Sequence, residues 1–148
     1  MSTKKLLLVE DNPDDIELTL RALKKNNIMN EVVIARDGEE ALRILFGPEP
    51  GWGKDLPSLP SVMLLDLKLP KVDGLGVLQR VRANPRTKHL PVVVLTSSKE
   101  DQDLVQSYSL GANSYVRKPV DFHRFVEAVQ QLGLYWLILN ETAPEIGT

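Results

Sequence analysis

Apolar residues gather along the chain in five short runs, and each run predicts a β-strand. The runs cover residues 5–10, 31–36, 61–66, 91–97 and 113–118. The first, third and fourth are continuously apolar rather than alternating, which is typical of strands covered on both faces in a parallel sheet. Because the second and fifth runs are more polar, we expect them to lie toward the edges of that sheet.

A stretch with helical character follows each apolar run. These stretches cover residues 12–26, 37–47, 74–84, 99–111 and 121–140. Five β-α units in strict alternation predict a doubly wound α/β domain with right-handed crossovers. The common strand order for such a domain, 2-1-3-4-5, gives a five-stranded parallel sheet of the flavodoxin-like type.

The ends of the helical stretches carry signals of their own. Asn12 is a candidate N-cap and Pro13 takes the first helical position, while acids in the first turn and lysines in the last suit the helix dipole. Gly47 and Gly111 are expected to stop two later helices. The residues expected to form the apolar face of the first helix are Ile16, Leu20 and Leu23, with Leu18 nearby.

One stretch interrupts the alternation of strands and helices. Residues 47–60 carry four prolines and three glycines, which predicts an inserted surface loop with Trp52 packed down on the domain. We expect residues 1–148 to form a single domain, because a chain of this length leaves little room for a second core. Its core would span residues 4–131, followed by an extension of the last helix to about 140 and a frayed tail over 141–148.

Composition and charge exclude several classes of partner. A net charge of −2, with acids and bases interspersed, offers no basic patch for nucleic acid or anionic lipid. The chain has no cysteine, which removes disulfides, thiolate metal sites and cysteine nucleophiles and fits a reducing compartment. The N-terminus leads into only four apolar residues, too few for a signal peptide. We therefore expect a cytoplasmic protein with no direct contact to nucleic acid or membrane.

Acidic residues stand at the ends of two predicted strands. Glu10 and Asp11 close the first strand, and Asp66 closes the third. Because these strands are neighbours in the order 2-1-3-4-5, the three carboxylates should meet where the strand order reverses. Carboxylates this close repel one another unless a cation lies among them, and Mg²⁺ suits a sparse set of oxygen ligands because it keeps several waters.

A hydroxyl and a lysine are expected at the same edge of the sheet. The fourth strand ends in Thr96 and Ser97, and the fifth ends in Lys118. A carboxylate beside a metal and a lysine can attack phosphorus, while a hydroxyl hydrogen-bonds a phosphoryl oxygen. The other acids near strand ends, which we expect to be helix caps or solvated residues, are Asp14, Asp15, Asp37, Asp73 and Asp121.

Four segments together resemble the receiver domains of two-component response regulators across residues 4 to about 131. They are, in order, "LLLVEDNP", "VMLLDLKLPKVDG", "VVVLTSS" and "GANSYVRKP". The resemblance implies that Asp66 accepts a phosphoryl group from a sensor histidine kinase. It also implies that Asp11 and Asp66 coordinate Mg²⁺ directly, that Glu10 acts through water, and that the Lys68 backbone carbonyl is a further ligand.

The same resemblance implies a switch. Thr96 would move toward the phosphoryl group, and Tyr115 would turn inward. Lys118 would pair with the phosphoryl group, and its peptide bond to Pro119 would be cis. Glu10 stands where many members have aspartate, and its longer side chain is expected to change the placement of water. Such a protein is a signalling switch rather than an enzyme, since it catalyses only its own phosphotransfer and dephosphorylation. With only about 30 residues after Lys118, we expect the signal to leave through a surface that meets a downstream protein.

The insertion at 47–60 and the ending "LGLYWLILN" are similar to response regulators paired with cyanobacterial and bacterial phytochromes. This similarity implies a phytochrome kinase as phosphodonor, with a non-phytochrome kinase as the alternative. Residues 134–139 are apolar all round the helix, so protein must cover part of them. We expect a homodimer with Tyr135 and Trp136 at the interface; the alternative is that the 47–60 loop covers this surface within the monomer.

Three rival functions fit less well. A phosphatase of the haloacid dehalogenase type needs a second aspartate two residues after the nucleophile, where this chain has Lys68. A dinucleotide site is not expected, because "GLGVLQ" has Gln79 in place of the third glycine and follows the third strand. His89 and His123 are far apart in sequence and are expected at the surface rather than in a metal site.

Overall fold

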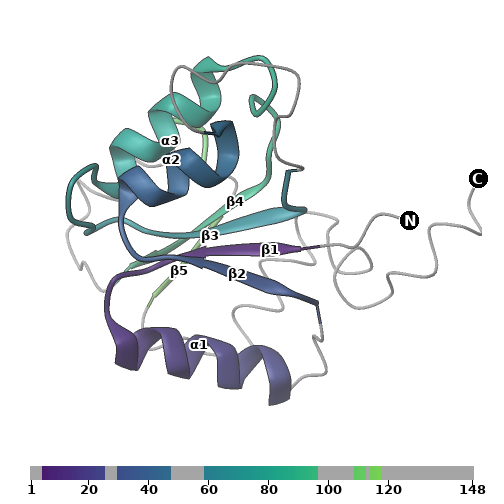
Figure 1. The fold of residues 1–148 in the computed structure, drawn as a ribbon, viewed down its shortest axis with the longest axis vertical. Coiled ribbons are helices and arrows are strands. Elements are labelled where there is room, and N and C mark those ends of the chain that lie inside the picture. Colours follow the sequence, from purple (N-terminus) through teal and green to yellow (C-terminus); the bar gives the residue numbers. More distant parts are fainter. Residues whose placement is uncertain (1–4, 26–29, 48–58, 97–108, 113, 118–148) are drawn as a thin grey trace, which may run out of the picture.

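The computed structural model describes residues 5–25, 30–47, 59–96, 109–112 and 114–117. Its five strands form one parallel sheet in the order β2-β1-β3-β4-β5 (Figure 1). They are β1 (Leu6–Val9), β2 (Val32–Ala35), β3 (Val62–Asp66), β4 (Val92–Thr96) and β5 (Ser114–Arg117). The predicted strand order is confirmed, and the two more polar strands lie at the edges, as expected.

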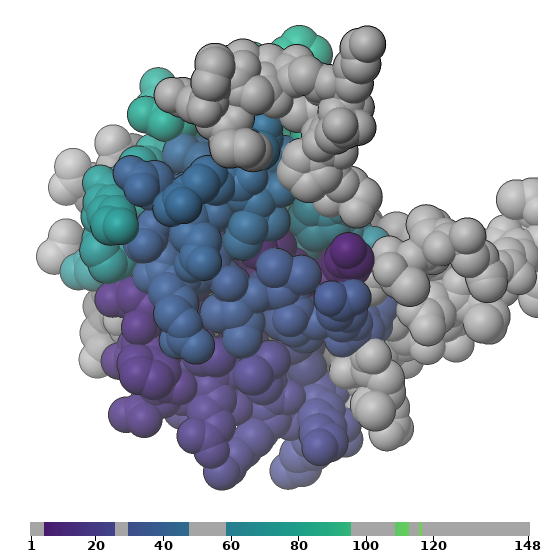
Figure 2. Space-filling view, viewed as in Figure 1, coloured from purple at the N-terminus to yellow at the C-terminus, as the bar shows by residue number. Residues whose placement is uncertain are grey.

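Helices cover both faces of this sheet. Helix α1 (Pro13–Lys25) lies on one face, while α2 (Gly38–Phe46) and α3 (Gly74–Ala83) lie side by side on the other (Figure 1). In the space-filling view of Figure 2, the purple residues of α1 lie below the blue residues of α2. No helix among the described residues is long and apolar enough to cross a membrane. Four predicted segments lie wholly or mostly outside the described residues. They are the helix over 121–140, most of the helix over 99–111, the tail over 141–148 and the 48–58 part of the loop.

The strands are continuously apolar because helices cover both faces of the sheet. In β1, Leu6 and Leu8 belong to the core cluster that includes Ile16 and Leu23 of α1. Leu7 and Val9 belong to the opposite cluster, which the residues of α2 and α3 complete. Because successive side chains of a strand point to opposite faces, every position of β1 is buried in one core or the other.

Side-chain caps fix where the helices begin. Asn12 Oδ1 accepts hydrogen bonds from the backbone N–H groups of Asp14 and Asp15, at 2.8 and 3.2 Å. Asp37 caps α2 by accepting from Glu40 N at 2.7 Å, and Asp73 caps α3 by accepting from the third residue of that helix at 2.8 Å. These contacts confirm Asn12 as an N-cap and confirm Asp37 and Asp73 as caps rather than site residues.

The apolar face of α1 differs from the prediction at one position. Leu18 is 46% exposed, whereas Thr19 is 2% exposed and joins Ile16 and Leu23 on the buried side. Leu18 follows Ile16 by two residues, and two residues turn an α-helix by more than half a circle, so both cannot face the sheet. Leu20 packs against the core as expected.

Candidate functional site

Three carboxylates meet at the carboxyl ends of the central strands. Glu10, Asp11 and Asp66 each offer an oxygen atom, and these atoms all lie within 4.8 Å of one another. Strands β1 and β3 pair with Val9 opposite Leu65, so the residues that follow, Glu10 and Asp66, are brought side by side. The strand order reverses at this point, which is where ligands bind in doubly wound sheets.

The cluster combines two buried acids with one exposed acid. Glu10 is 1% exposed and Asp66 is 4% exposed, whereas Asp11 faces solvent. Glu10 is held by its backbone, which donates to Ala35 O at 2.9 Å, and by its side chain, whose Oε2 accepts from Asn12 N at 3.2 Å. Two buried carboxylates of like charge, opening onto water through a third, form a donor set that fits a hard divalent cation.

The loop after β3 forms a groove next to this cluster. The groove has a volume of about 430 Å³ and is lined by Asp11 and by the loop residues Leu67, Lys68, Leu69, Pro70 and Asp73, with Leu75 of α3. Lys68 is exposed and borders the same hollow as Asp11, while the role of its backbone carbonyl as a ligand stays a prediction. The acid cluster can therefore be reached from the solvent side past Asp11.

Gly74 holds the loop against the strand that carries Asp66. Its N–H donates to Leu67 O at 2.9 Å, and a Cβ atom built at this position would lie 2.2 Å from the Asp66 carbonyl oxygen. Only glycine allows so close an approach between the start of α3 and the end of β3. The position of Asp66 is thus set by backbone packing on both of its sides, from β1 and from α3.

The structure describes the other predicted site residues only in part. Thr96 is the last residue of β4, where Leu95 pairs with Asp66, so its backbone lies at the same edge of the sheet as the acids. Tyr115 lies in β5, paired with Val94 of β4. Lys118 follows the last described residue of β5. The side chains of Thr96 and Tyr115, and the whole of Lys118, Tyr135 and Trp136, lie outside the described part of the structure.

One set of polar contacts, centred on Arg82 of α3, has no signal in the sequence. Its Nε donates to Gly111 O at 2.9 Å, and its Nη1 donates to Leu90 O at 2.7 Å and to Lys88 O at 3.1 Å. Burial lowers the pKa of this guanidinium from its ordinary value. Three arginines lie on or just after α3, and nothing in the sequence distinguishes Arg82 as the one that ties the helix to the segment before β5.

The fold and the acid cluster define a flavodoxin-like α/β protein with a candidate divalent-cation site at the carboxyl ends of its strands. Residues 6–130 match the model of the response regulator receiver domain family, and the chain belongs to that family.

Two curated relatives cover almost the whole chain. Response regulator Rcp1 of Synechocystis is 40% identical over 90% of this chain and 89% of its own length. A protein of Methanothrix harundinacea, named "Probable methanogenesis regulatory protein FilR2", is 42% identical over 93% of this chain and 86% of its own length.

Solved structures of response regulators are similar to this chain. The bacteriophytochrome response regulator AtBRR is 54% identical, with a TM-score of 0.78, and covers 92% of this chain and 96% of its own. The phosphorylated cyanobacterial phytochrome response regulator RcpA is 39% identical, with a TM-score of 0.73 and coverage of 92% and 95%. The Mn²⁺-bound form of Rcp1 is 38% identical, with a TM-score of 0.70 and coverage of 90% and 94%. The chain is a response regulator receiver domain related to Rcp1 and to the phytochrome response regulators AtBRR and RcpA.

Proposed function

We propose that this receiver domain takes a phosphoryl group from a sensor histidine kinase on Asp66 and signals to a partner protein by a change of conformation. The observation that carries the proposal is the convergence of Glu10, Asp11 and Asp66, with oxygens within 4.8 Å of one another at the ends of neighbouring strands. The phosphorylated state of the related RcpA supports it.

The transfer involves one bond formed and one broken. An oxygen of the Asp66 carboxylate forms a bond to phosphorus, while the bond between phosphorus and the imidazole nitrogen of the donor phosphohistidine breaks. The electron pair of the broken bond stays on the imidazole nitrogen. Water later attacks the same phosphorus, which releases inorganic phosphate and restores the Asp66 carboxylate.

A bound Mg²⁺ would supply positive charge for the phosphoryl oxygens in this transfer. Asp11 and Asp66 would hold it directly, Glu10 through water, and Lys68 through its backbone carbonyl. The all-oxygen donor set and the exposure of Asp11, which leaves room for bound waters, support this assignment. The Mn²⁺-bound form of the related Rcp1 is in line with it.

The switch residues in this proposal are Thr96, Tyr115 and Lys118. Thr96 donates its hydroxyl to a phosphoryl oxygen, Lys118 pairs its ammonium group with the same phosphoryl group, and Tyr115 fills the space that Thr96 leaves. The position of the β4 backbone beside Asp66 supports the role of Thr96. A shift from mostly inactive to mostly active requires a preference of about 5 kcal/mol between the two conformations, so weaker phosphate contacts shift the population only in part.

Phosphorylation by a small acyl phosphate tests the assignment of Asp66. Wild type incubated with Mg²⁺ and acetyl phosphate is expected to gain the mass of one phosphoryl group, and hydroxylamine should remove it because the product is an acyl phosphate. Asp66→Asn should gain nothing, whereas Asp14→Asn, which removes an exposed acid from the first turn of α1, should behave as wild type. Equal labelling of wild type and Asp66→Asn would overturn the proposal.

The upstream and downstream partners are also proposals. A phytochrome kinase is the preferred donor, supported by the similarity to AtBRR, Rcp1 and RcpA. We also propose that residues 1–148 form one receiver domain that pairs as a homodimer through Tyr135 and Trp136, supported by the apolar stretch around them. A solution mass equal to one chain of 16.6 kDa at micromolar concentration would contradict the dimer.

A further inference from the structure

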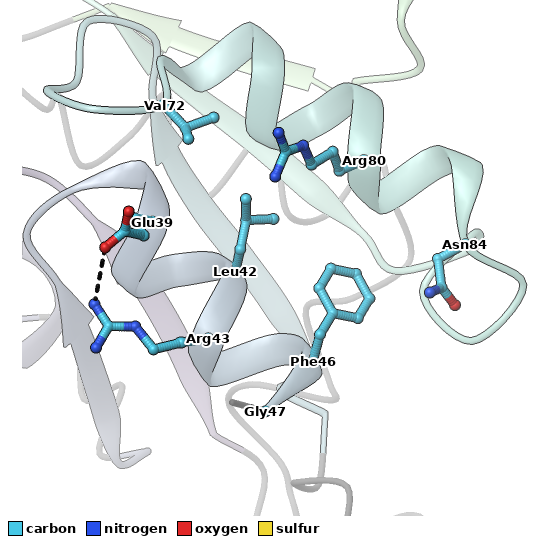
Figure 3. Close-up of a pocket in the computed structure, with 8 residues that line it drawn as sticks. All are labelled: Glu39, Leu42, Arg43, Phe46, Gly47, Val72, Arg80 and Asn84. Atoms are coloured by element: carbon cyan, nitrogen blue, oxygen red, sulfur yellow. Dashed lines mark hydrogen bonds and ion pairs between the residues drawn. The ribbon is translucent and has the colours of Figure 1, made fainter. Parts of the chain in front are cut away.

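We propose that the hollow between α2 and α3 is a binding site for a small aromatic monoanion, separate from the acid cluster and beyond the receiver function proposed above. The hollow measures about 580 Å³, which is larger than the groove beside Asp11. Its volume falls in the range of small-molecule pockets, roughly 300 to 1,000 Å³. Figure 3 shows its lining residues in the space between the two helices.

The walls of the hollow suit a flat apolar body. Leu42 and Phe46 project from α2 toward α3, and Val72, from the loop that leads into α3, lies at one end (Figure 3). Phe46 is 9% exposed, so its ring is fixed by the core on one side and borders the hollow on the other. An aromatic ring system can contact the accessible part of Phe46 together with the two aliphatic side chains.

The charged residues that line the hollow determine which sign of charge a ligand should carry. Arg43 pairs with Glu39 at 3.4 Å on the surface of α2, so these two charges offset each other. Arg80 of α3 has no carboxylate partner among the described residues, and its guanidinium faces the hollow (Figure 3). One uncompensated guanidinium beside an apolar wall fits a single carboxylate, which it can bind through two parallel hydrogen bonds.

Both ends of α2 are fixed, so the hollow is formed before a ligand arrives. At the start of the helix, Gly38 packs so tightly on the Val72 carbonyl that a Cβ atom would lie 1.8 Å from its oxygen. At the other end, Arg86 Nη1 donates to Leu45 O at 2.6 Å, which ties the last turn of α2 to the segment after α3. Because both walls are held in place, little ordering is needed when a ligand binds.

Three naphthalene compounds of matched shape test the site on the full chain. They are 1-naphthoate as the anion, 1-naphthalenemethanol as the neutral control and 1-naphthylmethylammonium as the cation. Titrations followed by backbone amide chemical shifts at low ionic strength should give the affinity order anion, neutral, cation, with the largest shifts at Leu42, Phe46 and Val72. We expect naphthoate to bind about tenfold more tightly than the alcohol, equivalent to about 1.4 kcal/mol.

A pair of charge-matched variants separates a specific contact from net charge. Arg80→Gln should reduce the affinity for naphthoate to that for the alcohol and leave the alcohol unaffected. Arg21→Gln removes the same charge from α1 on the other face of the sheet and should change neither affinity. The proposal is overturned if naphthoate binds no more tightly than the alcohol, if Arg80→Gln has no effect on naphthoate, or if another segment of the chain fills the hollow and none of the three compounds binds.

Discussion

Glu10 has the lowest exposure of any charged residue in the described part of the chain, at 1%. Burial of a carboxylate costs free energy unless hydrogen bonds or an opposite charge compensate it. The backbone N–H of Asn12 provides one hydrogen bond, but the nearby Asp66 carboxylate has the same sign and is also buried. Two buried carboxylates of like charge at this distance favour a cation between them.

The Glu10→Gln variant should be more stable than wild type without a cation and should bind the cation less well. Glutamine keeps the shape and can still accept from Asn12 N, while one negative charge leaves the cluster. Without Mg²⁺, we expect the free energy of unfolding to rise by roughly 1 kcal/mol because a repulsive interaction is removed. With millimolar Mg²⁺, wild type should gain stability by binding the ion and the variant should gain less. Urea unfolding with and without Mg²⁺ measures both effects.

Asp14→Asn provides the control for Glu10→Gln. It removes one charge from an exposed position in the first turn of α1, outside the acid cluster, so its gain from Mg²⁺ should equal that of wild type. If Glu10→Gln were less stable than wild type without the ion and gained as much from Mg²⁺, Glu10 would have no part in a cation site.

The strands and three helices could be predicted from the sequence because local signals specify them. Continuous apolar runs marked the buried strands, and Asn12, Asp37 and Asp73 lie where helices begin. The acids of the site could be predicted as well, since strand order alone brings Glu10 next to Asp66. Arg82 could not, because its partner Gly111 is 29 residues away and only the folded chain brings them together.

The contacts of Arg82 link three segments of the chain. One guanidinium joins the end of α3, the segment that leads into β4 and the segment that leads into β5. A Cβ atom at Gly111 would lie 2.9 Å from Arg82 Nε, and the φ of +95° at this glycine strains any other residue. The Arg82 side chain therefore needs a glycine at position 111, and the contact between them holds the segment that leads into β5.

Arg82→Gln should destabilise the domain by about 2 to 3 kcal/mol, because hydrogen bonds from a charged donor to three carbonyl groups are lost. Arg80→Gln provides a matched control, since it lies on the same helix, is exposed and lacks a carboxylate partner among the described residues. We expect that control to change the free energy of unfolding by less than about 0.5 kcal/mol. Chemical denaturation of the three proteins gives the comparison, and equal stabilities of the two variants would show that the Arg82 contacts contribute nothing.

At the scale of the whole molecule, the acid cluster and the hollow between α2 and α3 occupy different places on the fold. The acid cluster lies at the carboxyl ends of β1 and β3, and its groove opens past Asp11 and Lys68 to solvent. The larger hollow lies between α2 and α3 on one face, and Val72 of the loop after β3 lines it. The loop over residues 67–73 therefore borders both regions.

We expect the surface around the acid groove to select the phosphodonor, because a kinase must contact this surface to reach Asp66. Specificity is a difference between affinities for competing partners, so the test compares kinases rather than measuring one.

We expect a phytochrome kinase to phosphorylate this chain with a kcat/KM at least tenfold higher than that of a non-phytochrome histidine kinase, a difference of about 1.4 kcal/mol. Radiolabel transfer from each phosphorylated kinase measures the rates, with Asp66→Asn as the control that should stay unlabelled. The comparison is needed because a relative that is 42% identical, FilR2, is named as a probable methanogenesis regulatory protein, so similarity alone does not select the kinase. A non-phytochrome kinase that transfers far faster would overturn the phytochrome assignment and leave the phosphorylation of Asp66 intact.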